Sequence, residues 1–234
     1  MVNIAILGFG TVGSGVAEVL TRNGGLIDGR VNNQVRLKYI MRARDIFEGP
    51  YKDLFVKDFS IIERDPEVSI VVETIGGVGA ALDYTTRALK AGKSVVTANK
   101  ELVAAHGYEL LQLAKEHGVS YLFEASVGGG IPILRPLNAC LAANEVDQVT
   151  GILNGTTNYI LTRMIKAGLT FDQALKEAQA NGYAEQDPTA DVDGHDACRK
   201  TCILAALSFG QHIYPDQVPT QGICLLYTSD AAET

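Results

Sequence analysis

The fold of this chain is decided by residues 3–13, which read NIAILGFGTVG. The apolar run at its start is typical of a buried strand, and a helical pattern follows the glycines as far as Arg22. In this G-x-G-x-x-G context, Gly8 permits a tight turn, Gly10 lets the backbone approach a pyrophosphate, and Gly13 allows close packing of helix against strand. The stretch therefore predicts a Rossmann dinucleotide-binding site, in which N–H groups at the helix start hold the phosphates. A purely structural glycine turn is the alternative.

Strand and helix patterns alternate downstream of this stretch. Short β-branched runs typical of buried parallel strands are separated by helical patterns. The predicted strands after the first are 35–41, 68–73, 94–97 and 120–124, and the predicted helices are 11–22, 79–91 and 101–117. This alternation indicates an α/β fold with a doubly wound parallel sheet.

The character of the sequence changes after Glu124, where residues 126–132 read SVGGGIP. Beyond this glycine-rich hinge we predict a helix at 133–143, a strand at 145–153, and then mainly helices to about Gly210. We therefore place a domain boundary near residue 130. The prediction is a Rossmann domain over 1–130 and an α+β domain over 131–223.

Charge and hydropathy argue against a nucleic acid or a membrane as a binding partner of this chain. The net charge is −7 and no run of Lys or Arg occurs, which argues against a nucleic-acid partner. No apolar stretch approaches the roughly 20 residues of a membrane span, and the N-terminus runs into a strand pattern without a signal peptide. The chain is therefore expected to be cytoplasmic, with its four cysteines as reduced thiols rather than metal ligands: Cys140, Cys198, Cys202 and Cys224.

The end of the second predicted strand bears on the choice of cofactor. An acidic residue there would bind the ribose hydroxyls of NAD, but this sequence reads MRARD over residues 41–45. Arg42 or Arg44 could instead accept the 2′-phosphate of NADP. We favour NADP, with NAD possible. Either arginine could also be a solvated surface charge.

Residues 182–200 form the densest polar segment of the chain. Asp196 and Lys200 are four residues apart, which places them on one helix face. Such a pair is commonly a minor stabiliser of a surface helix. Here it follows a loop that carries Glu185, Asp187 and Asp191, beside a nucleotide-binding fold. Such a group could hold an ammonium-bearing substrate and present a lysine as proton donor.

The segment from Ala178 to Lys200 resembles, position by position, the homoserine dehydrogenase signature A-x3-G-Y-x-E-x-D-P-x2-D-x2-G-x-D-x3-K. Further segments are similar to the same family and follow in its order up to about residue 223. They are GFGTVG at 8–13, TANK at 97–100, FEASVGGGIP at 123–132 and LNGTTNYIL at 153–161.

The resemblance implies NAD(P)-dependent interconversion of L-homoserine and L-aspartate 4-semialdehyde, on the route to threonine, methionine and isoleucine. At matching positions, Lys200 is the implied proton donor, and Glu185 and Asp196 are implied substrate ligands, to which we add Asp191 from the same acidic loop. Lys100 matches a lysine at the nicotinamide and substrate end of the Rossmann cleft. The residue at 195, a histidine, is variable in the family pattern, and we interpret it as structural.

The resemblance also implies further ligand contacts. Four residues match cofactor contacts: Thr11, Val12, Thr74 and Gly182. Four others match a site for a monovalent cation, sodium, made of one carboxylate and backbone carbonyls: Glu124, Val127, Gly129 and Ile131. From the residues alone this loop reads as a hinge. A homodimer is implied through the second domain.

The resemblance fails at the C-terminal end. Residues 224–234, CLLYTSDAAET, do not resemble the family and do resemble an in-frame translation of a transposon-based sequencing adaptor. We expect a truncation near Gly222 or Ile223, a tail that is an assembly artefact, and an incomplete second domain.

Three hypotheses follow for this polypeptide. It is an active homoserine dehydrogenase, or a fragment that binds NADP without turnover, or another Rossmann enzyme such as a semialdehyde dehydrogenase. The third needs a nucleophilic cysteine in a loop, whereas Cys140, Cys198 and Cys202 lie in helical patterns. The motif NGTTN at 154–158 is either a helix cap or part of a substrate pocket.

Overall fold

The computed structural model describes residues 1–42 and 49–224, and the chain divides into two compact units, Met1–Ile133 and Leu134–Thr234. Each unit is described by itself. The division falls three residues after the predicted boundary at 130. Arg44 and residues 225–234 of the predicted tail lie outside the described residues.

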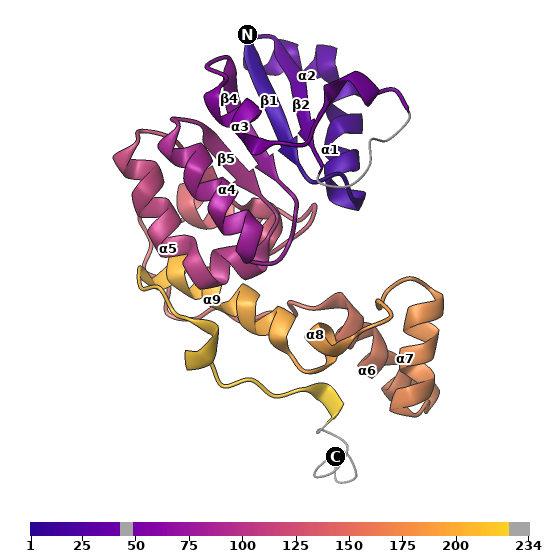
Figure 1. Ribbon diagram of the computed structural model, residues 1–234. Coiled ribbons are helices and arrows are strands. Elements are labelled where there is room, and N and C mark those ends of the chain that lie inside the picture. The colour runs from indigo at the N-terminus through magenta and orange to yellow at the C-terminus, as the bar shows by residue number, and fades with distance from the viewer. Residues whose placement is uncertain (43–48, 225–234) are drawn as a thin grey trace. The chain divides into compact units, whose positions relative to one another are not determined.

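The first unit is built on a six-stranded sheet in the order β3-β2-β1-β4-β5-β6, in which every paired strand is parallel (Figure 1). The strands are β1 (Val2–Leu7), β2 (Val35–Met41), β3 (Phe55–Val56), β4 (Val68–Glu73), β5 (Ser94–Thr97) and β6 (Tyr121–Leu122). The direction of strand order reverses between β1 and β4. This reversal is the topological switch point at which doubly wound sheets bind ligands, so the predicted α/β class is confirmed.

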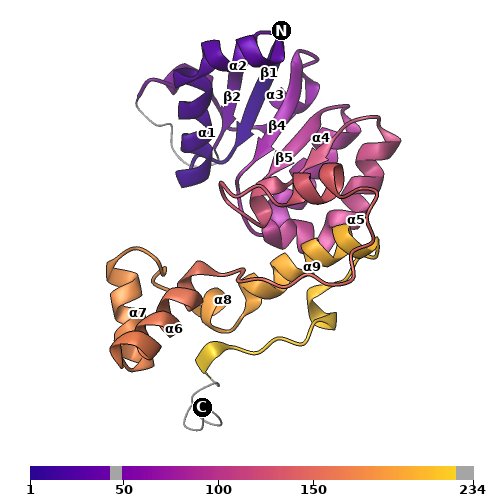
Figure 2. The ribbon, with the colours of Figure 1, turned by 180° about the vertical axis from the view of Figure 1, so that it is seen from behind.

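Helices cover this sheet. They are α1 (Thr11–Arg22), α2 (Gly24–Val31), α3 (Phe59–Arg64), α4 (Gly79–Lys90) and α5 (Lys100–Glu116), with 3₁₀ turns η1 (Lys52–Leu54) and η2 (Glu124–Ser126). α1 packs on β1 and β2, whereas α4 and α5 lie side by side and contact β4, β5 and β6 (Figures 1 and 2). The core consists of the apolar side chains of the central strands, of which Ile6, Leu7 and Val71 are wholly buried.

Three expectations for the first unit need correction. The polar stretch expected after Asn23 contains α2, which ends at Asn32 in a left-handed conformation. β3 and α3 were not expected, because a two-residue strand carries no periodic pattern. The strand expected at 120–124 pairs only over Tyr121–Leu122, and Glu124 begins a 3₁₀ turn instead.

All regular elements among the described residues of the second unit are helices or helical turns. They form α6 (Gly155–Ala167), α7 (Phe171–Ala180), α8 (Thr189–Val192) and α9 (His195–Phe209), with a π-helical turn η3 (Pro136–Cys140) and a 3₁₀ turn η4 (Pro215–Gln217). A small apolar core joins these helices: Ile160, Met164, Ala174, Ala178, Ala184 and Val192. The predicted run of helices up to Gly210 is confirmed.

Two expectations for the second unit are wrong. The helix expected at 133–143 is shorter than predicted: Leu134 and Arg135 are helical and continue into the π-helical η3, which ends at Cys140. The strand expected at 145–153 has no regular structure and is mostly exposed. Its β-branched residues suit a strand, but none of the described residues in this unit provides a partner strand for pairing.

Candidate active site

The glycine-rich turn after β1 has the geometry that its sequence predicts. Gly8 has φ +96, and a Cβ there would lie 2.8 Å from the carbonyl oxygen of Thr74. A Cβ on Gly13 would collide with the carbonyl oxygen of Gly8, whereas a Cβ on Gly10 would meet nothing within 4 Å. Gly8 and Gly13 are therefore required by the protein itself. Gly10 leaves open the space that a pyrophosphate needs.

The other predicted cofactor residues of the first unit surround this turn. The Thr74 hydroxyl donates to the carbonyl oxygen of Leu7 at 2.9 Å, which fixes Thr74 at the switch point between β1 and β4. Thr11 and Val12 open α1, where the first backbone N–H groups have no intrahelical acceptor. Arg42 directly follows β2, and its backbone N–H donates to the carbonyl oxygen of Val56 at 3.1 Å.

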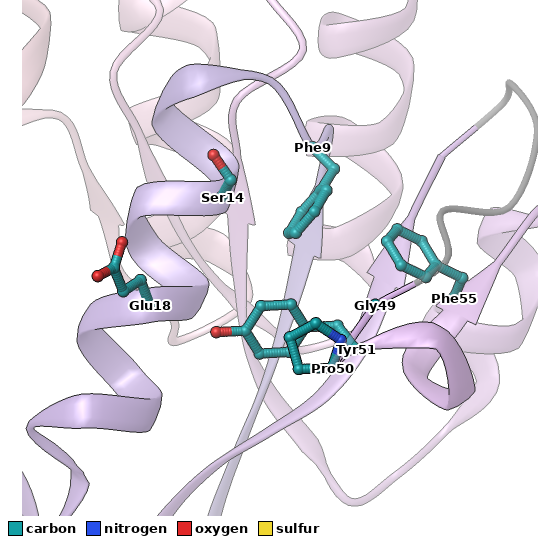
Figure 3. A pocket seen from close by; sticks show the side chains of 7 residues that line it. All are labelled: Phe9, Ser14, Glu18, Gly49, Pro50, Tyr51 and Phe55. Carbon is teal, nitrogen blue, oxygen red and sulfur yellow. The ribbon is translucent and has the colours of Figure 1, made fainter.

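An aromatic pocket of about 340 Å³ lies beside the same turn. The ring of Phe9 makes edge contacts with Tyr51 at 5.9 Å and Phe55 at 5.2 Å between centroids. Figure 3 shows these rings together, with Ser14 and Glu18 of α1 at the side of the pocket. The sequence analysis did not identify this pocket. The aromatic residue between the first two glycines was the signal that could have pointed to it.

Lys100 is the first residue of α5, at the carboxyl edge of the sheet. The preceding Asn99 is the N-cap of that helix, and its side chain accepts a hydrogen bond from the backbone N–H of Leu102 at 3.1 Å. The sequence therefore places Lys100 correctly, just beyond the carboxyl end of β5.

In the second unit the predicted catalytic lysine lies in a hydrogen-bonded cluster. Lys200 and Asp196 both belong to α9, and the Lys200 Nζ lies 2.8 Å from Asp196 Oδ2. The same Nζ donates to the carbonyl oxygen of Leu153 at 2.9 Å. Asp196 is buried, and the Lys200 side chain is 16% exposed. Because an ammonium group has three donors, these two acceptors leave one proton for a ligand oxygen, as far as the described residues show.

Asn154 connects this ion pair to the acidic loop. Its Nδ2 donates to Asp191 Oδ1 at 2.7 Å and to Asp196 Oδ2 at 2.9 Å. Its Oδ1 accepts from the backbone N–H of Thr157 at 2.8 Å, which caps α6. Asn154 is therefore a helix cap and also a partner of two predicted substrate ligands. The helix-cap alternative for this motif is confirmed, and a part in the substrate pocket stays a prediction.

The remaining predicted residues of this unit, Gly182 and Glu185, lie on the loop between α7 and α8. Gly182 turns the chain with φ +75. The exposed Glu185 is held through its backbone, whose carbonyl accepts from Gln179 Nε2 at 3.1 Å. The Thr156 hydroxyl donates to the carbonyl oxygen of Tyr183 at 2.7 Å and ties this loop to the start of α6. The loop therefore presents the carboxylate of Glu185 to solvent while its backbone is fixed.

The predicted cation loop folds around Glu124. Its Oε1 accepts a hydrogen bond from the backbone N–H of Ile133 at 2.7 Å. A Cβ on Gly128 would lie 2.6 Å from the carbonyl oxygen of Ile131, so glycine is required for that carbonyl to turn inward. The loop thus brings one carboxylate and a glycine-dependent turn together in sequence, and oxygen ligands are the kind that hard cations prefer.

The four cysteines are free thiols, and two of them, Cys198 and Cys202, are buried in α9. Burial raises the pKa of Cys202 to about 12, and the neighbouring Cys198 contributes to the same shift. Within the described ranges no cluster of His, Cys, Asp or Glu could hold a metal ion. His195 is exposed at the start of α9.

Known proteins match both units. The family model described as "Homoserine dehydrogenase, NAD binding domain" matches residues 8–124, and the model "Homoserine dehydrogenase" matches residues 132–234. The homoserine dehydrogenase of Lactococcus lactis is 44% identical over 98% of this chain and 55% of its own length. The chain therefore spans about half the length of the curated relatives it matches.

Solved structures agree with these matches. The crystal structure of a homoserine dehydrogenase from Thiobacillus denitrificans has a TM-score of 0.88 and 41% identity, over 96% of this chain and 53% of that one. A hyperthermophilic archaeal homoserine dehydrogenase in complex with NADPH has a TM-score of 0.80 and 29% identity, over 95% of this chain and 74% of that one. Within the described residues, no helix has the length and apolar character that a membrane span requires.

Proposed function

Because the chain belongs to the homoserine dehydrogenase family, we propose that it catalyses NADP-dependent interconversion of L-homoserine and L-aspartate 4-semialdehyde. The observation that carries this proposal is the position of Lys200 between Asp196 and the carbonyl of Leu153, in the segment that resembles the family signature. Two of the three protons of the Lys200 ammonium group are bonded to these acceptors, and, within the described part of the chain, the third is available to a substrate oxygen.

The first unit binds the cofactor in this proposal. NADP supplies or accepts the hydride through its nicotinamide ring. Gly8, Gly10 and Gly13 let the pyrophosphate approach the start of α1, with Thr11 and Val12 contributing backbone N–H groups. Thr74 lies at the switch point. Arg42, at the end of β2, is placed to pair with the 2′-phosphate, which is the reason for favouring NADP over NAD.

The second unit holds the substrate and moves the proton. When the aldehyde is reduced, the carbonyl oxygen develops negative charge, and the Lys200 ammonium donates a proton to it. Asp196 orients Lys200, and Asn154 keeps Asp196 in place. Glu185, exposed on its loop, together with Asp191, suits the substrate's ammonium group. Gly182 contacts the cofactor, and Lys100 contributes a second positive charge near the reacting carbonyl.

The oxygen donors around Glu124 would hold a sodium ion, with Val127, Gly129 and Ile131 contributing carbonyls. Such an ion would fix the turn that follows the Rossmann domain. Further parts of the proposal are a homodimer formed through the second unit, a cytoplasmic location, and a role in threonine, methionine and isoleucine biosynthesis. The domain roles are cofactor binding for residues 1–130 and substrate binding for 131–223.

A second candidate function is binding of NADP without turnover. The observation that favours it is that the glycine turn proposed to hold the pyrophosphate lies in a unit with a core of its own, Met1–Ile133. Thr74 and the glycine turn lie together at the switch point of that unit, whereas the segment 145–153 of the second unit has no strand partner among the described residues.

The deciding experiment is NADP-dependent oxidation of L-homoserine, followed by NADPH absorbance. Lys200→Met keeps the length of the side chain and removes the amine that would accept the alcohol proton in this direction and return it in the reverse reaction, so kcat should fall at least about 100-fold. Lys166→Ala, an exposed lysine on α6, is the matched control and should leave kcat unchanged. Turnover by Lys200→Met at the unsubstituted rate would overturn the assignment of Lys200. NADPH binding without turnover in the unsubstituted chain would establish the second candidate.

A further inference from the structure

A completely buried carboxylate stands at the end of β4, outside the residues that the proposed function uses. Glu73 has an exposed fraction of 0%. Its Oε1 accepts from the backbone N–H groups of Ile75 at 2.7 Å and Gly76 at 3.3 Å. Its Oε2 accepts from the hydroxyl of Thr97, on β5, at 2.6 Å. Burying a carboxylate costs free energy unless hydrogen-bond donors surround it. The donors that surround Glu73 therefore indicate what this carboxylate holds together.

The hydrogen bonds continue from Thr97 into the next loop. The Thr97 hydroxyl oxygen accepts from the backbone N–H of Asn99 at 2.9 Å. Asn99 then donates through Nδ2 to the carbonyl oxygen of Gly77 at 2.6 Å, back in the loop after β4. Its Oδ1 caps α5 at Leu102. Hydrogen bonds therefore run from Glu73 through Thr97 and Asn99 to Gly77. They connect the loop after β4 with the loop after β5.

These two loops carry residues of the proposed site. Thr74 directly follows Glu73, and Lys100 directly follows Asn99. Both loops lie on the β4–β5 side of the switch point. The adenosine ribose of a dinucleotide lies at the end of β2, so the nicotinamide half falls on the β4–β5 side.

We propose that Glu73 is a positioning residue, which holds the loops after β4 and β5 in the one arrangement that accepts the nicotinamide half of the cofactor. The inference rests on the proposed function, because it concerns the same cofactor. In this inference Glu73 contacts neither the substrate nor the cofactor. It acts by fixing the backbone beside Thr74 and the start of α5 at Lys100.

The test compares two ligands and a set of conservative variants in the full chain. NADPH has both halves of the cofactor, whereas 2′,5′-ADP has the adenosine half alone. Glu73→Gln keeps the size of the side chain but places an amide N–H₂ against the Thr97 hydroxyl or the loop N–H groups. Thr97→Val removes the hydroxyl at nearly constant volume, and Thr97→Ser restores it.

Lys93→Met is the matched control. Lys93 is also buried, at 3% exposure, and its amine donates to the carbonyl oxygens of Asp65 at 2.6 Å and Val68 at 3.0 Å. These bonds lie at the opposite end of β4 and β5. Lys93→Met should lower the unfolding temperature while leaving the affinities for both ligands unchanged.

Glu73→Gln and Thr97→Val should each weaken NADPH binding about tenfold, leave 2′,5′-ADP binding within about twofold, and speed amide exchange in peptides covering residues 74–77 and 98–101. Thr97→Ser should bind NADPH as the unsubstituted chain does. Equal losses of affinity for both ligands, or an unchanged NADPH affinity in a folded Thr97→Val protein, would overturn the role of Glu73. Neither result would contradict the proposed function. An unsubstituted chain that binds neither ligand would instead overturn the proposed function, and amide exchange would still decide whether Glu73 couples the loops.

Discussion

At the scale of single residues, one amide side chain connects helix formation with the proposed chemistry. The Asn154 side chain makes four hydrogen bonds. Its Oδ1 accepts from the backbone N–H and the hydroxyl of Thr157, and its Nδ2 donates to Asp191 and Asp196. Sequence reasoning predicted a cap or a pocket residue here, since an N-G-T pattern fits both. It could not find the carboxylate partners, which are 37 and 42 residues away in the chain.

The two roles of Asn154 can be separated by substitution. Asn154→Ser keeps a good N-cap but cannot donate to both carboxylates, so kcat should fall at least about tenfold, and the lost donation to the buried Asp196 should cost about 1–3 kcal/mol of unfolding free energy. Thr170→Ala provides the reverse control, because Thr170 caps α7 with no contact to the cluster. It should cost about 1 kcal/mol of stability and leave kcat unchanged. Matching losses of kcat in both variants would contradict the assignment.

A second residue-scale prediction concerns pH and the first unit. The Lys38 ammonium lies 2.6 Å from Asp65, and its hydrogen bond is the main reason that the pKa of Asp65 falls from an ordinary 3.8 to about 2. A depressed pKa means that the stabilisation is complete above pH 4 and is lost as pH falls toward 2. Urea unfolding of the unsubstituted chain and of Asp65→Asn should therefore differ most near pH 5 and converge by pH 2. A difference that stays constant over this range would refute the prediction.

At the scale of elements, the glycine turn between β1 and α1 separates folding from ligand binding. Gly13→Ala should destabilise the first unit, because its Cβ collides with the backbone of Gly8. Gly10→Ala should fold normally, because Gly10 has φ −86 and open space around it. The alanine methyl group would nevertheless take up the space beside Gly10 into which the pyrophosphate is proposed to bind. Thermal unfolding and NADPH titration of both variants check this, and tight NADPH binding by Gly10→Ala would show that the phosphates lie elsewhere.

Elements were predictable where local pattern and final environment agree. β1, β4 and β5 are largely apolar runs with buried residues, β2 alternates apolar and basic residues, and α1, α4 and α5 have one buried face, so periodicity alone located them to within about a residue. Elements that depend on distant partners were not predictable. β3 exists because Phe55 and Val56 pair with Ile40 and Met41. The segment 145–153 has strand-forming residues and stays irregular, because no described residue of its unit pairs with it.

At the scale of the whole molecule, the chain consists of two units, each with a core of its own. Ligand binding to one such unit stabilises it by RT ln(1 + [L]/Kd), which is about 2.7 kcal/mol at a hundredfold excess over Kd. In the proposed function, the phosphates and the nicotinamide half of NADP would both bind to residues of the first unit. This linkage should therefore act first on the sheet of residues 1–133.

Hydrogen exchange with and without NADPH tests this linkage. Peptides from β1, β4 and β5 should exchange about 100-fold more slowly at that excess of NADPH, because exchange through unfolding of the unit scales with its stability. Peptides from α6 and α7, which have a separate core, should change little until L-homoserine is added as well. Gly10→Ala is the control, since it should abolish the protection by NADPH and leave the exchange of the free chain unaltered. Equal protection of α6 and α7 by NADPH alone would show that the two units unfold as one cooperative body, in which case the cofactor stabilises the substrate-binding residues before any substrate is present.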